Sequence, residues 1–591
     1  MSTHKPNKIL TFFKSLRDKI SQKQFMVLLS IPVGIVAALA AITIKLLAHG
    51  IAYVSKSIIF SSSNILYFVM PIVGILLTIL IVKYIIRKPV GHGIPGILYA
   101  ISQNSGIVKP HTMYSSLITS VITVGMGGSV GLEGPSVSTG ASLGSNIGRL
   151  LKLNHKQIIL LIGMGSAAAL AAIFKAPITG VVFAMEVLMI DLSLTALVPL
   201  IISSFTAIMV SYFLMGGAVE YNVQITEGFI HANFVYYIAL GLFLGLVSAY
   251  FLNVSFKCEK VFKKINSPWT RFAIAGSLLG VLIFLFPALY GEGYEAINAA
   301  LQGAYSILYK NTIFAQWSDS KFVVIFILVG VIILKAFATS FTFAAGGVGG
   351  TFAPAMFMGA FSGLFFALVI NTLGLGNIDP AKFALVGMGG FVAGMLHAPL
   401  SGIFLIAEIT NGYSLMVPLM IVSALSYIIN RLFFSESIYT RPVAEQGVTL
   451  SHNKDVSILN MMAINRLIET NFSTIKFDKT LGDLIPIIST STRNIFPVVD
   501  DEGNFKGHVI FDDIRNVIFD NSLYNNPISN YLVYPQYTIA PSDSMESVAE
   551  KFKCSGKYNI PVIQNGKYLG YISRANVFST YRTTMSEMSD E

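Results

Sequence analysis

The chain alternates long apolar runs with short polar breaks over roughly its first three quarters, and the pattern then changes. The first charge-free runs are Phe25–Thr43 and Ile65–Val82, lengths that approach a membrane span. Apolar segments continue to about Ile429, and from about Ser451 short β-branched runs lie between charged helical stretches. The pattern predicts an N-terminal segment (1–24), a helical membrane domain (25–445) and a soluble α/β domain (446–591).

The membrane domain repeats internally. Residues 175–186 (KAPITGVVFAME) are echoed by residues 397–408 (HAPLSGIFLIAE), and a glycine-rich break ending in proline precedes each copy, at 131–135 and 346–354. Interrupted apolar segments at matching positions of two halves point to a transport site between the halves. We place the halves at about 25–220 and 230–432 and expect many tilted and broken helices.

The soluble domain also repeats. Residues 494–499 (NIFPVV) match residues 559–563 (NIPVI) with Pro497 and Pro561 aligned, and residues 507–513 match residues 570–576. Each unit, at about 455–520 and 525–585, is expected to fold as strand, helix, strand, strand, helix.

Composition supports the membrane assignment. The chain is 54% hydrophobic and only 12% charged, whereas soluble domains carry about 25% charged residues. Residues 1–24 are basic and lack a signal-peptide cleavage pattern, and Lys83, Arg87 and Lys88 follow the second apolar run. Basic loops favour the cytoplasmic side, so we expect both termini to be cytoplasmic and the protein to lie in the cell (inner) membrane. The net charge of +10 then reflects contact with anionic lipid, and no nucleic-acid partner is needed.

The other chemistry that the sequence could carry is limited. Cys258 and Cys554 lie in different regions, which gives no disulfide framework and no metal-ligand spacing. We therefore expect no catalytic residue, no metal site and no required cofactor.

Glu133 is the most informative residue of the chain. It lies in Gly-Leu-Glu-Gly-Pro (131–135), between two glycines and before a proline, within a long apolar region. An ionisable group in a membrane segment is rare and costly, so it is a functional candidate by default. Pro135 fits the first turn of a helix, and the free amides of that turn attract anions. The segment predicts a helix that starts within the membrane, where Glu133 competes with an anion for one position.

Four stretches stand out together: Gly91-His-Gly-Ile-Pro95, Gly131–Pro135, Gly349-Gly-Thr-Phe-Ala-Pro354 and the segment around Tyr439. In this order they resemble the CLC family of chloride channels and proton/chloride antiporters, and the tail resembles a tandem pair of CBS domains. The resemblance implies an α-helical polytopic fold of two inverted halves, a homodimer with one pore per subunit, and chloride as the bound ion. Partial charges of about +0.5 at helix N-termini would hold a dehydrated chloride moderately, as conduction requires.

The resemblance also assigns the site residues. Glu133 matches the gating glutamate, and Leu132 stands where the family commonly has arginine. Thr351 and Phe352 would present backbone amides to the outer anion position, and Tyr439 its hydroxyl to the central one. For Glu133 the alternative is a helix cap, and for Tyr439 it is packing.

His92 departs from the family, which most often has serine there. Gly93 and Ile94 still offer backbone amides. An imidazole could donate to chloride and would bind it more tightly when protonated, or it could face solvent while the amides alone coordinate the ion.

Val187 separates two mechanisms. Antiporters of the family usually carry an internal proton-relay glutamate there, and valine cannot accept a proton. This favours a passive chloride channel gated by Glu133 over a proton-coupled antiporter, although some family antiporters lack this acid. Glu186 is interpreted as structural because Glu408 lies at the same place in the second repeat.

The CBS resemblance makes an adenine nucleotide a candidate ligand. Thr474 and Asp513 are the candidate contacts in the first repeat, where Ile510 replaces the usual hydroxyl residue, and Ser573 and Asn576 are the candidates in the second. The alternative is a scaffold that dimerises or couples to the gate. A remote alternative for the whole protein is a nucleotide-sensing regulatory membrane protein.

Overall fold

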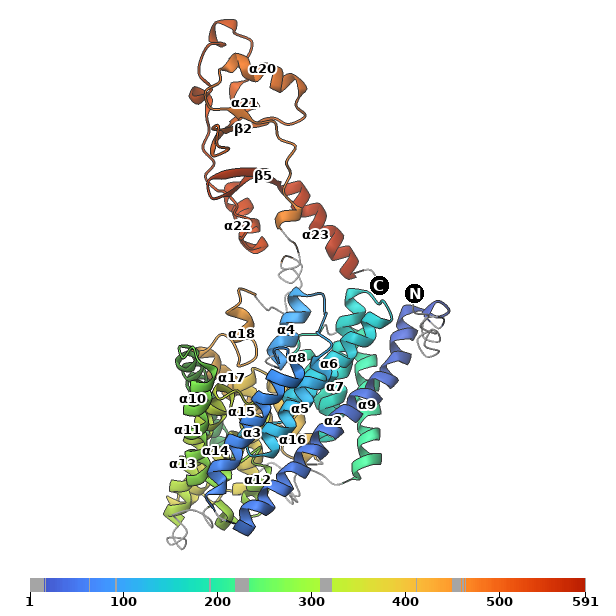
Figure 1. The fold of residues 1–591 in the computed structure, drawn as a ribbon, viewed down its shortest axis with the longest axis vertical. Helices are drawn as coiled ribbons and strands as arrows, with labels where there is room; N and C mark the ends of the chain where they lie inside the picture. The colour runs from blue at the N-terminus through green and yellow to red at the C-terminus, as the bar shows by residue number, and fades with distance from the viewer. Residues whose placement is uncertain are drawn as a thin grey trace. The chain divides into compact units, whose positions relative to one another are not determined.

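The chain forms two compact units, Met1–Val448 and Thr449–Glu591. A computed structural model describes residues 15, 17–62, 64–90, 93–190, 193–217, 233–308, 321–410, 412–448, 459, 462 and 464–589. Gly91 and His92 lie outside the described residues. Figure 1 shows the first unit as a packed bundle of helices in many orientations and the second as a small mixed module.

The regular elements described in the membrane unit are all helices, and many of these helices are short or interrupted. Its first half contains α2 (Gln22–Ser62), α3 (Leu66–Leu80) with a π-helical end (Ile81–Ile86), α4 (Ile94–Gln103), α5 (Thr112–Gly125), α6 (Glu133–Leu150), α7 (His155–Phe174), α8 (Pro177–Glu186) and α9 (Leu194–Met215). Its second half contains α10 (Phe234–Lys263), α11 (Pro268–Leu285), η3 (Pro287–Leu289), α12 (Tyr294–Leu301), η4 (Tyr305–Leu308), α13 (Lys321–Ala344), α14 (Phe352–Thr372), α15 (Pro380–Leu396), α16 (Pro399–Ile409), α17 (Met416–Phe433) and α18 (Arg441–Ala444).

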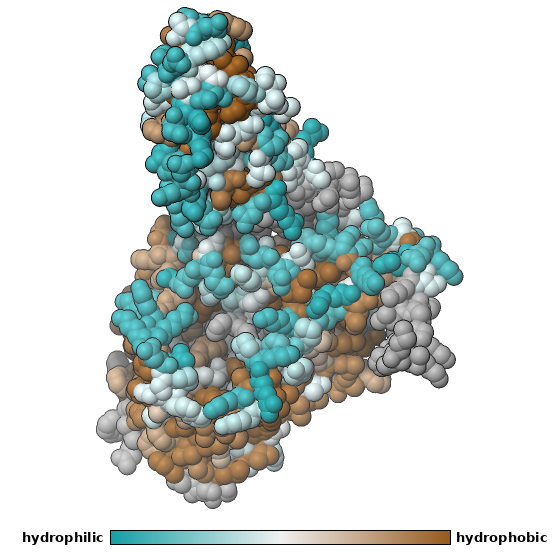
Figure 2. Space-filling model, turned by 45° about the horizontal axis from the view of Figure 1, so that its top comes forward, coloured by the Kyte–Doolittle hydropathy of each residue, from teal (hydrophilic) through white to brown (hydrophobic). Residues whose placement is uncertain are grey.

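Among the described residues, nine helices are long and apolar enough to cross a membrane, which confirms the integral membrane assignment. The first apolar run belongs to a helix much longer than the run itself. At 1.5 Å per residue, the 41 residues of α2 extend about 60 Å, twice the thickness of a bilayer core. In Figure 1, α2 runs obliquely along the bundle. Figure 2 shows hydrophobic side chains over much of the visible surface of the membrane unit.

The two halves repeat one helix-packing device. A methyl group on Gly140 of α6 would lie 2.2 Å from the carbonyl oxygen of Gly165 on α7. In the second half, a methyl group on Gly359 of α14 would lie 2.4 Å from the carbonyl oxygen of Gly387 on α15. Glycine thus lets the backbones of α6 and α7, and of α14 and α15, touch. The αL residues Lys175 (φ 55°) and His397 (φ 57°) then end α7 and α15 in the same way.

The second unit contains the expected repeat, with one strand and one helix shortened. The first copy has β1 (Ile475–Lys476), α20 (Leu481–Thr490), β2 (Ile495–Val499), β3 (Phe505–Ile510) and a four-residue α21 (Phe511–Ile514), and the second has α22 (Met545–Ser555), β4 (Asn559–Gln564), β5 (Lys567–Ser573) and α23 (Arg574–Ser589). The short element η6 (Ile464–Arg466) precedes the first copy, and η7 (Asn521–Leu523) and η8 (Ile528–Tyr531) lie between the two copies.

Pairing follows the alignment of the two prolines. The sheet order is β1-β2-β3, with β1 parallel and β3 antiparallel to β2, and β4 pairs antiparallel with β5. Pro497 lies opposite His508, and Pro561 lies opposite Tyr571. The strand expected at the start of the second copy is reduced to one parallel bridge between Ile539 and Val562. Each copy has its own apolar core, one around Val498 and Leu484 and one around Val562 and Val548.

Candidate anion site

The glycine-rich breaks of the two halves pair directly with each other. The N–H of Gly131 donates to the carbonyl of Gly350 at 2.8 Å, and the N–H of Gly350 donates to the carbonyl of Gly131 at 2.7 Å. A methyl group on Gly134 would lie 2.9 Å from the Cα of Gly350, so only glycine allows this approach. The contact sets the N-termini of α6 and α14 side by side, as expected for a site between two halves.

Glu133 is the first residue of α6 and is 1% exposed. Its Oε1 accepts a hydrogen bond from the hydroxyl of Tyr294, and its Oε2 is buried without a hydrogen-bond partner among the described residues. A methyl group on Gly131 would lie 2.2 Å from this Oε2 and 3.2 Å from the backbone nitrogen of Ala353. The backbone amides of Glu133 and Ala353 both face the carboxylate. The carboxylate thus lies where two helix N-termini favour an anion.

Phe352 and Thr351 lie at the matching place in the second half. Phe352 is the first residue of α14 and is 1% exposed, with ring centroids 5.7 Å from Phe174 and 6.1 Å from Phe183. Thr351 donates from Oγ1 to the hydroxyl of Tyr439 at 3.3 Å. Tyr439 accepts this bond and therefore still has its own hydroxyl hydrogen to donate. The structure brings Tyr439, which is 5% exposed, to the start of α14.

The start of α4 approaches the same region. Gly93 (φ 65°) precedes Ile94, the first residue of α4, and a methyl group on Gly93 would lie 4.0 Å from the carbonyl oxygen of Gly134. The short helix α18, which follows Tyr439, packs against α4. The described residues of all four sequence stretches thus lie around the start of α6, while His92 lies outside the part of the chain that the structure describes.

Three residues of this region were missed by sequence reasoning: Lys45, Glu292 and Tyr294. Together with Leu132, Glu133, Ile173 and Phe174 they line a small cavity of about 10 Å³, room for about one water molecule. The N–H of Leu132 donates to Oε1 of Glu292 at 3.0 Å. Lys45 interrupts an apolar run, and an ionisable residue in a membrane segment is the signal that could have found it.

A second buried lysine stands beside the glycine break. Lys335 of α13 is fully buried and donates to Oγ of Ser129 at 2.9 Å and to the carbonyl of Gly291 at 3.3 Å. Its ammonium also lies 4.6 Å from the ring centroid of Phe357. These contacts place a positive group behind the segment that carries Glu133 without placing it in the cavity.

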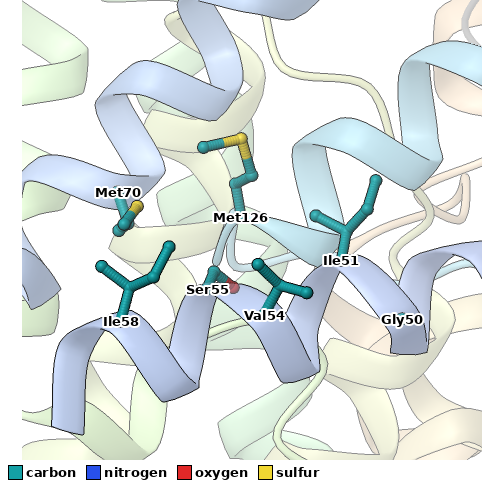
Figure 3. Close-up of a pocket in the computed structure, with 7 residues that line it drawn as sticks. All are labelled: Gly50, Ile51, Val54, Ser55, Ile58, Met70 and Met126. Atoms are coloured by element: carbon teal, nitrogen blue, oxygen red, sulfur yellow. The ribbon is translucent and has the colours of Figure 1, made fainter. Parts of the chain in front are cut away.

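A larger recess nearby has a different character. It has a volume of about 260 Å³ and is lined by Gly50, Ile51, Val54, Ser55, Ile58, Met70 and Met126 (Figure 3). Ser55 is the one lining residue with a polar side chain, and it donates to the carbonyl of Gly125 at 2.8 Å. The recess offers no free donor to an anion, so we assign it no part in anion binding.

Glu186 and Glu408 cap helices of opposite halves. Glu186, at the end of α8, accepts from the N–H groups of Leu400 and Ser401 at 3.1 and 2.8 Å, at the start of α16. Glu408, near the end of α16, accepts from the N–H groups of Ile178 and Thr179 at 2.9 and 2.8 Å, at the start of α8. The hydroxyls of Ser401 and Thr179 add a further bond to each. This reciprocal contact supports the structural interpretation of Glu186.

We predict that Glu186→Gln lowers stability and leaves transport intact. The amide loses the charge that complements the N-terminus of α16, which is worth about 1 kcal/mol. Melting of the protein in detergent measures this, and Glu408→Gln, which makes the same change at the mirrored cap, should lower the melting temperature by a similar amount. A variant that melts like the parent but loses chloride flux would assign Glu186 to transport instead.

Val187 follows this cap as the C-terminal boundary residue of α8 and is 5% exposed. Its side chain carries no group that exchanges a proton. The neighbouring acid, Glu186, is held by three donors at α16. The structure therefore gives this end of α8 no free carboxylate at either position.

The CBS residues differ in their surroundings. Thr474 and Asp513 are exposed, just before β1 and within α21. In the second copy, Ser573 donates to Glu469 at 2.5 Å and accepts from the N–H of Asn576 at 3.1 Å, while the amide of Asn576 donates to the carbonyl of Leu467 at 3.3 Å. The second-copy candidates are thus already bonded within the protein.

Aromatic side chains of both copies meet between them. Tyr571 lies 4.5 Å from Phe472, centroid to centroid, and shares a hydrogen bond of 3.0 Å with Nδ1 of His508. Burial and then the charge of Lys557 lower the pKa of His508 to about 4. The imidazole is therefore neutral at physiological pH, as suits a group packed among aromatic rings.

Comparisons with known proteins agree with this architecture. The family model described as voltage gated chloride channel matches residues 74–431, and a CBS domain model matches residues 528–582. A putative chloride channel protein, ClcB-like, of Ralstonia nicotianae is 29% identical over 381 residues, which are 63% of this chain and 84% of that protein. The description as a chloride channel belongs to that relative.

Two solved structures share the fold. A slow cyanobacterial Cl⁻/H⁺ antiporter aligns with a TM-score of 0.59 at 22% identity, covering 72% of this chain and 98% of that one. A eukaryotic CLC transporter aligns with a TM-score of 0.60 at 19% identity, covering 96% of this chain and 98% of that one. The matched family model spans more than half of the chain, and the fold and the paired glycine breaks agree with it: this protein belongs to the voltage gated chloride channel (CLC) family and carries a CBS domain at its C-terminal end.

Proposed function

We propose that this protein is a passive chloride channel in which Glu133 is the gate. The observation that carries the proposal is the carboxylate of Glu133, buried between the starts of α6 and α14 with Oε2 unpartnered. The two helix N-termini favour an anion at this position. An unpaired buried oxygen costs about 1–3 kcal/mol, so the carboxylate of Glu133 is held there less firmly than a fully hydrogen-bonded one. Chloride can replace the carboxylate when it is protonated or swings away.

The other groups around this position suit a dehydrated halide. The amides at the starts of α4, α6 and α14 and the hydroxyl of Tyr439 are neutral donors, and they attract an anion without the full charge that would trap it. Gly93, Ile94, Thr351 and Phe352 are the proposed sources of backbone donors. Selective conduction needs binding of this moderate strength.

Val187 supports passive conduction over proton coupling. Coupled exchange requires a group that carries protons from the inner side to Glu133, and neither Val187 nor the capped Glu186 suits that task. The competing function, proton/chloride antiport, is favoured by Glu133 itself and by the likeness of the fold to structures described as a Cl⁻/H⁺ antiporter and a fluoride/proton antiporter. A purely regulatory role as a nucleotide sensor is the remote alternative.

Anion efflux from liposomes tests the proposal. Purified protein in vesicles loaded with chloride should release chloride when valinomycin lets potassium follow, and empty vesicles should not. Release of nitrate and fluoride under the same conditions measures selectivity. Vesicles that hold chloride as long as protein-free vesicles do would contradict the proposal and favour the regulatory alternative.

We predict that His92→Ser changes the selectivity between chloride and nitrate or removes a dependence on internal pH. A protonated imidazole would add charge at the inner entrance, whereas a serine hydroxyl donates at all pH values. Bi-ionic reversal potentials at internal pH 5.5 and 7.5 measure both effects. The same potentials for the variant and the parent at both pH values would mean that the imidazole does not contact the ion.

The wider assignment follows from the family. We propose a homodimer with one pathway per subunit in the cell (inner) membrane, with both termini cytoplasmic. The exposed apolar surface of α9 and α17, which includes Phe205 and Met420, supplies area for lipid or for a second subunit.

We predict that the CBS unit binds one adenine nucleotide per chain, at the first copy. Asp513 is exposed and can accept from ribose hydroxyls, whereas Ser573 is already bonded to Glu469, a carboxylate that would repel a phosphate. Calorimetric titration of the full-length protein with ATP and AMP measures binding. Asp513→Ala should abolish it and Ser573→Ala should not, and a parent protein that gives no binding heat would favour the scaffold alternative.

A further inference from the structure

Lys45 places a basic side chain beside Glu133, and it comes from α2, outside the glycine-rich segments. It lies in the middle of α2, is 7% exposed, and lines the small cavity together with Leu132, Glu133 and Tyr294. Lys45 and Glu133 are thus a basic and an acidic side chain at one cavity. Lys45 also donates to the carbonyl of Ile173, at the end of α7, at 3.1 Å.

The packing of α2 fixes Lys45 in this position. Ile44 and Ala48, which flank Lys45 on α2, belong to one buried cluster with Leu132, the residue before Glu133. Leu132 is apolar, and the segment Gly131–Pro135 contains no basic residue. The side chain of Leu132 packs on α2, and Lys45 of α2 lines the same cavity as Leu132.

We propose that Lys45 is the positioning residue that holds the ionised carboxylate of Glu133 in its blocking place and so supplies the charge that the Gly131–Pro135 segment lacks. The inference rests on the proposed gating role of Glu133. A cation within a few ångströms favours the charged form of a buried carboxylate, and removing that cation favours its protonation. Protonated Glu133 yields its place to chloride more readily.

Other polar and charged groups lie around the segment that carries Glu133. They are Glu292 and Tyr294 next to α12, Lys335 on α13, Tyr439 before α18 and the amide of Ala353 on α14. Oε1 of Glu292 accepts a hydrogen bond from the N–H of Leu132 at 3.0 Å, and Oε2 of Glu292 lies 3.9 Å from Nε2 of His49. Lys335 bonds to Ser129 and Gly291 and does not line the cavity. Lys45 is therefore the described cation that lines the cavity of Glu133.

A structural role for Lys45 is the competing interpretation. An ammonium at the carbonyl of Ile173 stabilises the C-terminal end of α7 through the helix dipole. The two roles depend on different properties of the side chain. Capping needs a donor, whereas holding Glu133 ionised needs a charge.

Three substitutions separate the roles. Lys45→Arg keeps donor and charge, Lys45→Gln keeps a donor without charge, and Lys45→Met keeps neither. Lys56→Met is the matched control, because Lys56 lies on the same helix and pairs at 2.5 Å with Glu295, away from the cavity. Each variant is reconstituted, and chloride efflux is measured from pH 4.5 to 8 with equal pH on both sides.

We expect both Lys45→Gln and Lys45→Met to move the pH of half-maximal flux upward by about one unit, a tenfold change in proton concentration. Lys45→Arg and Lys56→Met should keep the parent profile. A Gln variant with the parent profile would overturn the proposal and leave Lys45 as a cap. If Lys45→Met does not fold, the Gln and Arg pair decides alone.

The outcome is distinguishable from failure of the proposed function. If Glu133→Gln leaves flux and its pH profile unchanged, the gate itself is wrong. If Glu133→Gln changes the profile and Lys45→Gln does not, only the role of Lys45 fails.

Discussion

Glu133→Gln is expected to raise chloride flux about tenfold near neutral pH and to remove its dependence on pH. Glutamine has nearly the shape of a protonated glutamate and carries no charge. It therefore cannot compete with chloride for the anion position as an ionised carboxylate does. If the free energy that holds the side chain in the blocking position falls by about 1.4 kcal/mol, the equilibrium between the blocked and open positions changes tenfold. Chloride efflux at several pH values measures both effects.

The control for this experiment removes a nearby carboxylate that does not face the pathway. Glu295 lies on α12 and is exposed in its pair with Lys56, so Glu295→Gln should retain the flux and the pH profile of the parent. A Glu133→Gln protein that behaves like Glu295→Gln would mean that Glu133 only caps α6.

Gly144→Ala is expected to destabilise the membrane unit by about 3 kcal/mol. A methyl group on Gly144 would lie 2.0 Å from the carbonyl oxygen and 2.6 Å from the carbonyl carbon of Leu161, and both atoms belong to the backbone of α7. No side chain can move aside, so α6 and α7 must separate. Because α6 begins at Glu133, the shift also displaces the gate. Melting temperature and the monodisperse fraction in detergent measure the loss.

The matched control is Gly276→Ala on α11. The nearest atom to a methyl group there lies 3.8 Å away, an ordinary contact, and alanine favours a helix over glycine by about 1 kcal/mol. This variant should melt at or above the temperature of the parent. The mirrored Gly363→Ala, where the methyl group would lie 2.1 Å from the carbonyl oxygen of Phe383, should fail like Gly144→Ala. Equal stability of Gly144→Ala and Gly276→Ala would contradict the close packing of α6 on α7.

The sequence predicted local structure correctly where a short pattern is compatible with only one local structure. Gly131–Pro135 and Gly349–Pro354 each combine glycine for close approach with proline for a helix start, and both expectations are met at α6 and α14. The repeat of Lys175–Glu186 in His397–Glu408 likewise predicted two related halves. Their relation appears as the reciprocal caps of Glu186 and Glu408.

The missed residues of the site depend on long-range packing. Tyr294 reaches Glu133 from the start of α12, and Lys45 reaches it from α2, and no spacing in the sequence relates either residue to Gly131–Pro135. The length of α2 was also underestimated, because the charges of Lys45 and Lys56 interrupt the apolar run without ending the helix. In the tail, the aligned repeats predicted β2, β3, β4 and β5, whereas the bond from Ser573 to Glu469 could not be foreseen from the motif.

Simultaneous measurement of chloride and proton flux from purified protein in liposomes tests the central claim most directly. For a passive channel without a proton relay at Val187, an outward chloride gradient should drive chloride release with no accompanying proton uptake, and the reversal potential should stay at the chloride equilibrium value when a pH gradient is imposed. Proton movement against its own gradient, in fixed proportion to chloride, would contradict the claim and establish an antiporter.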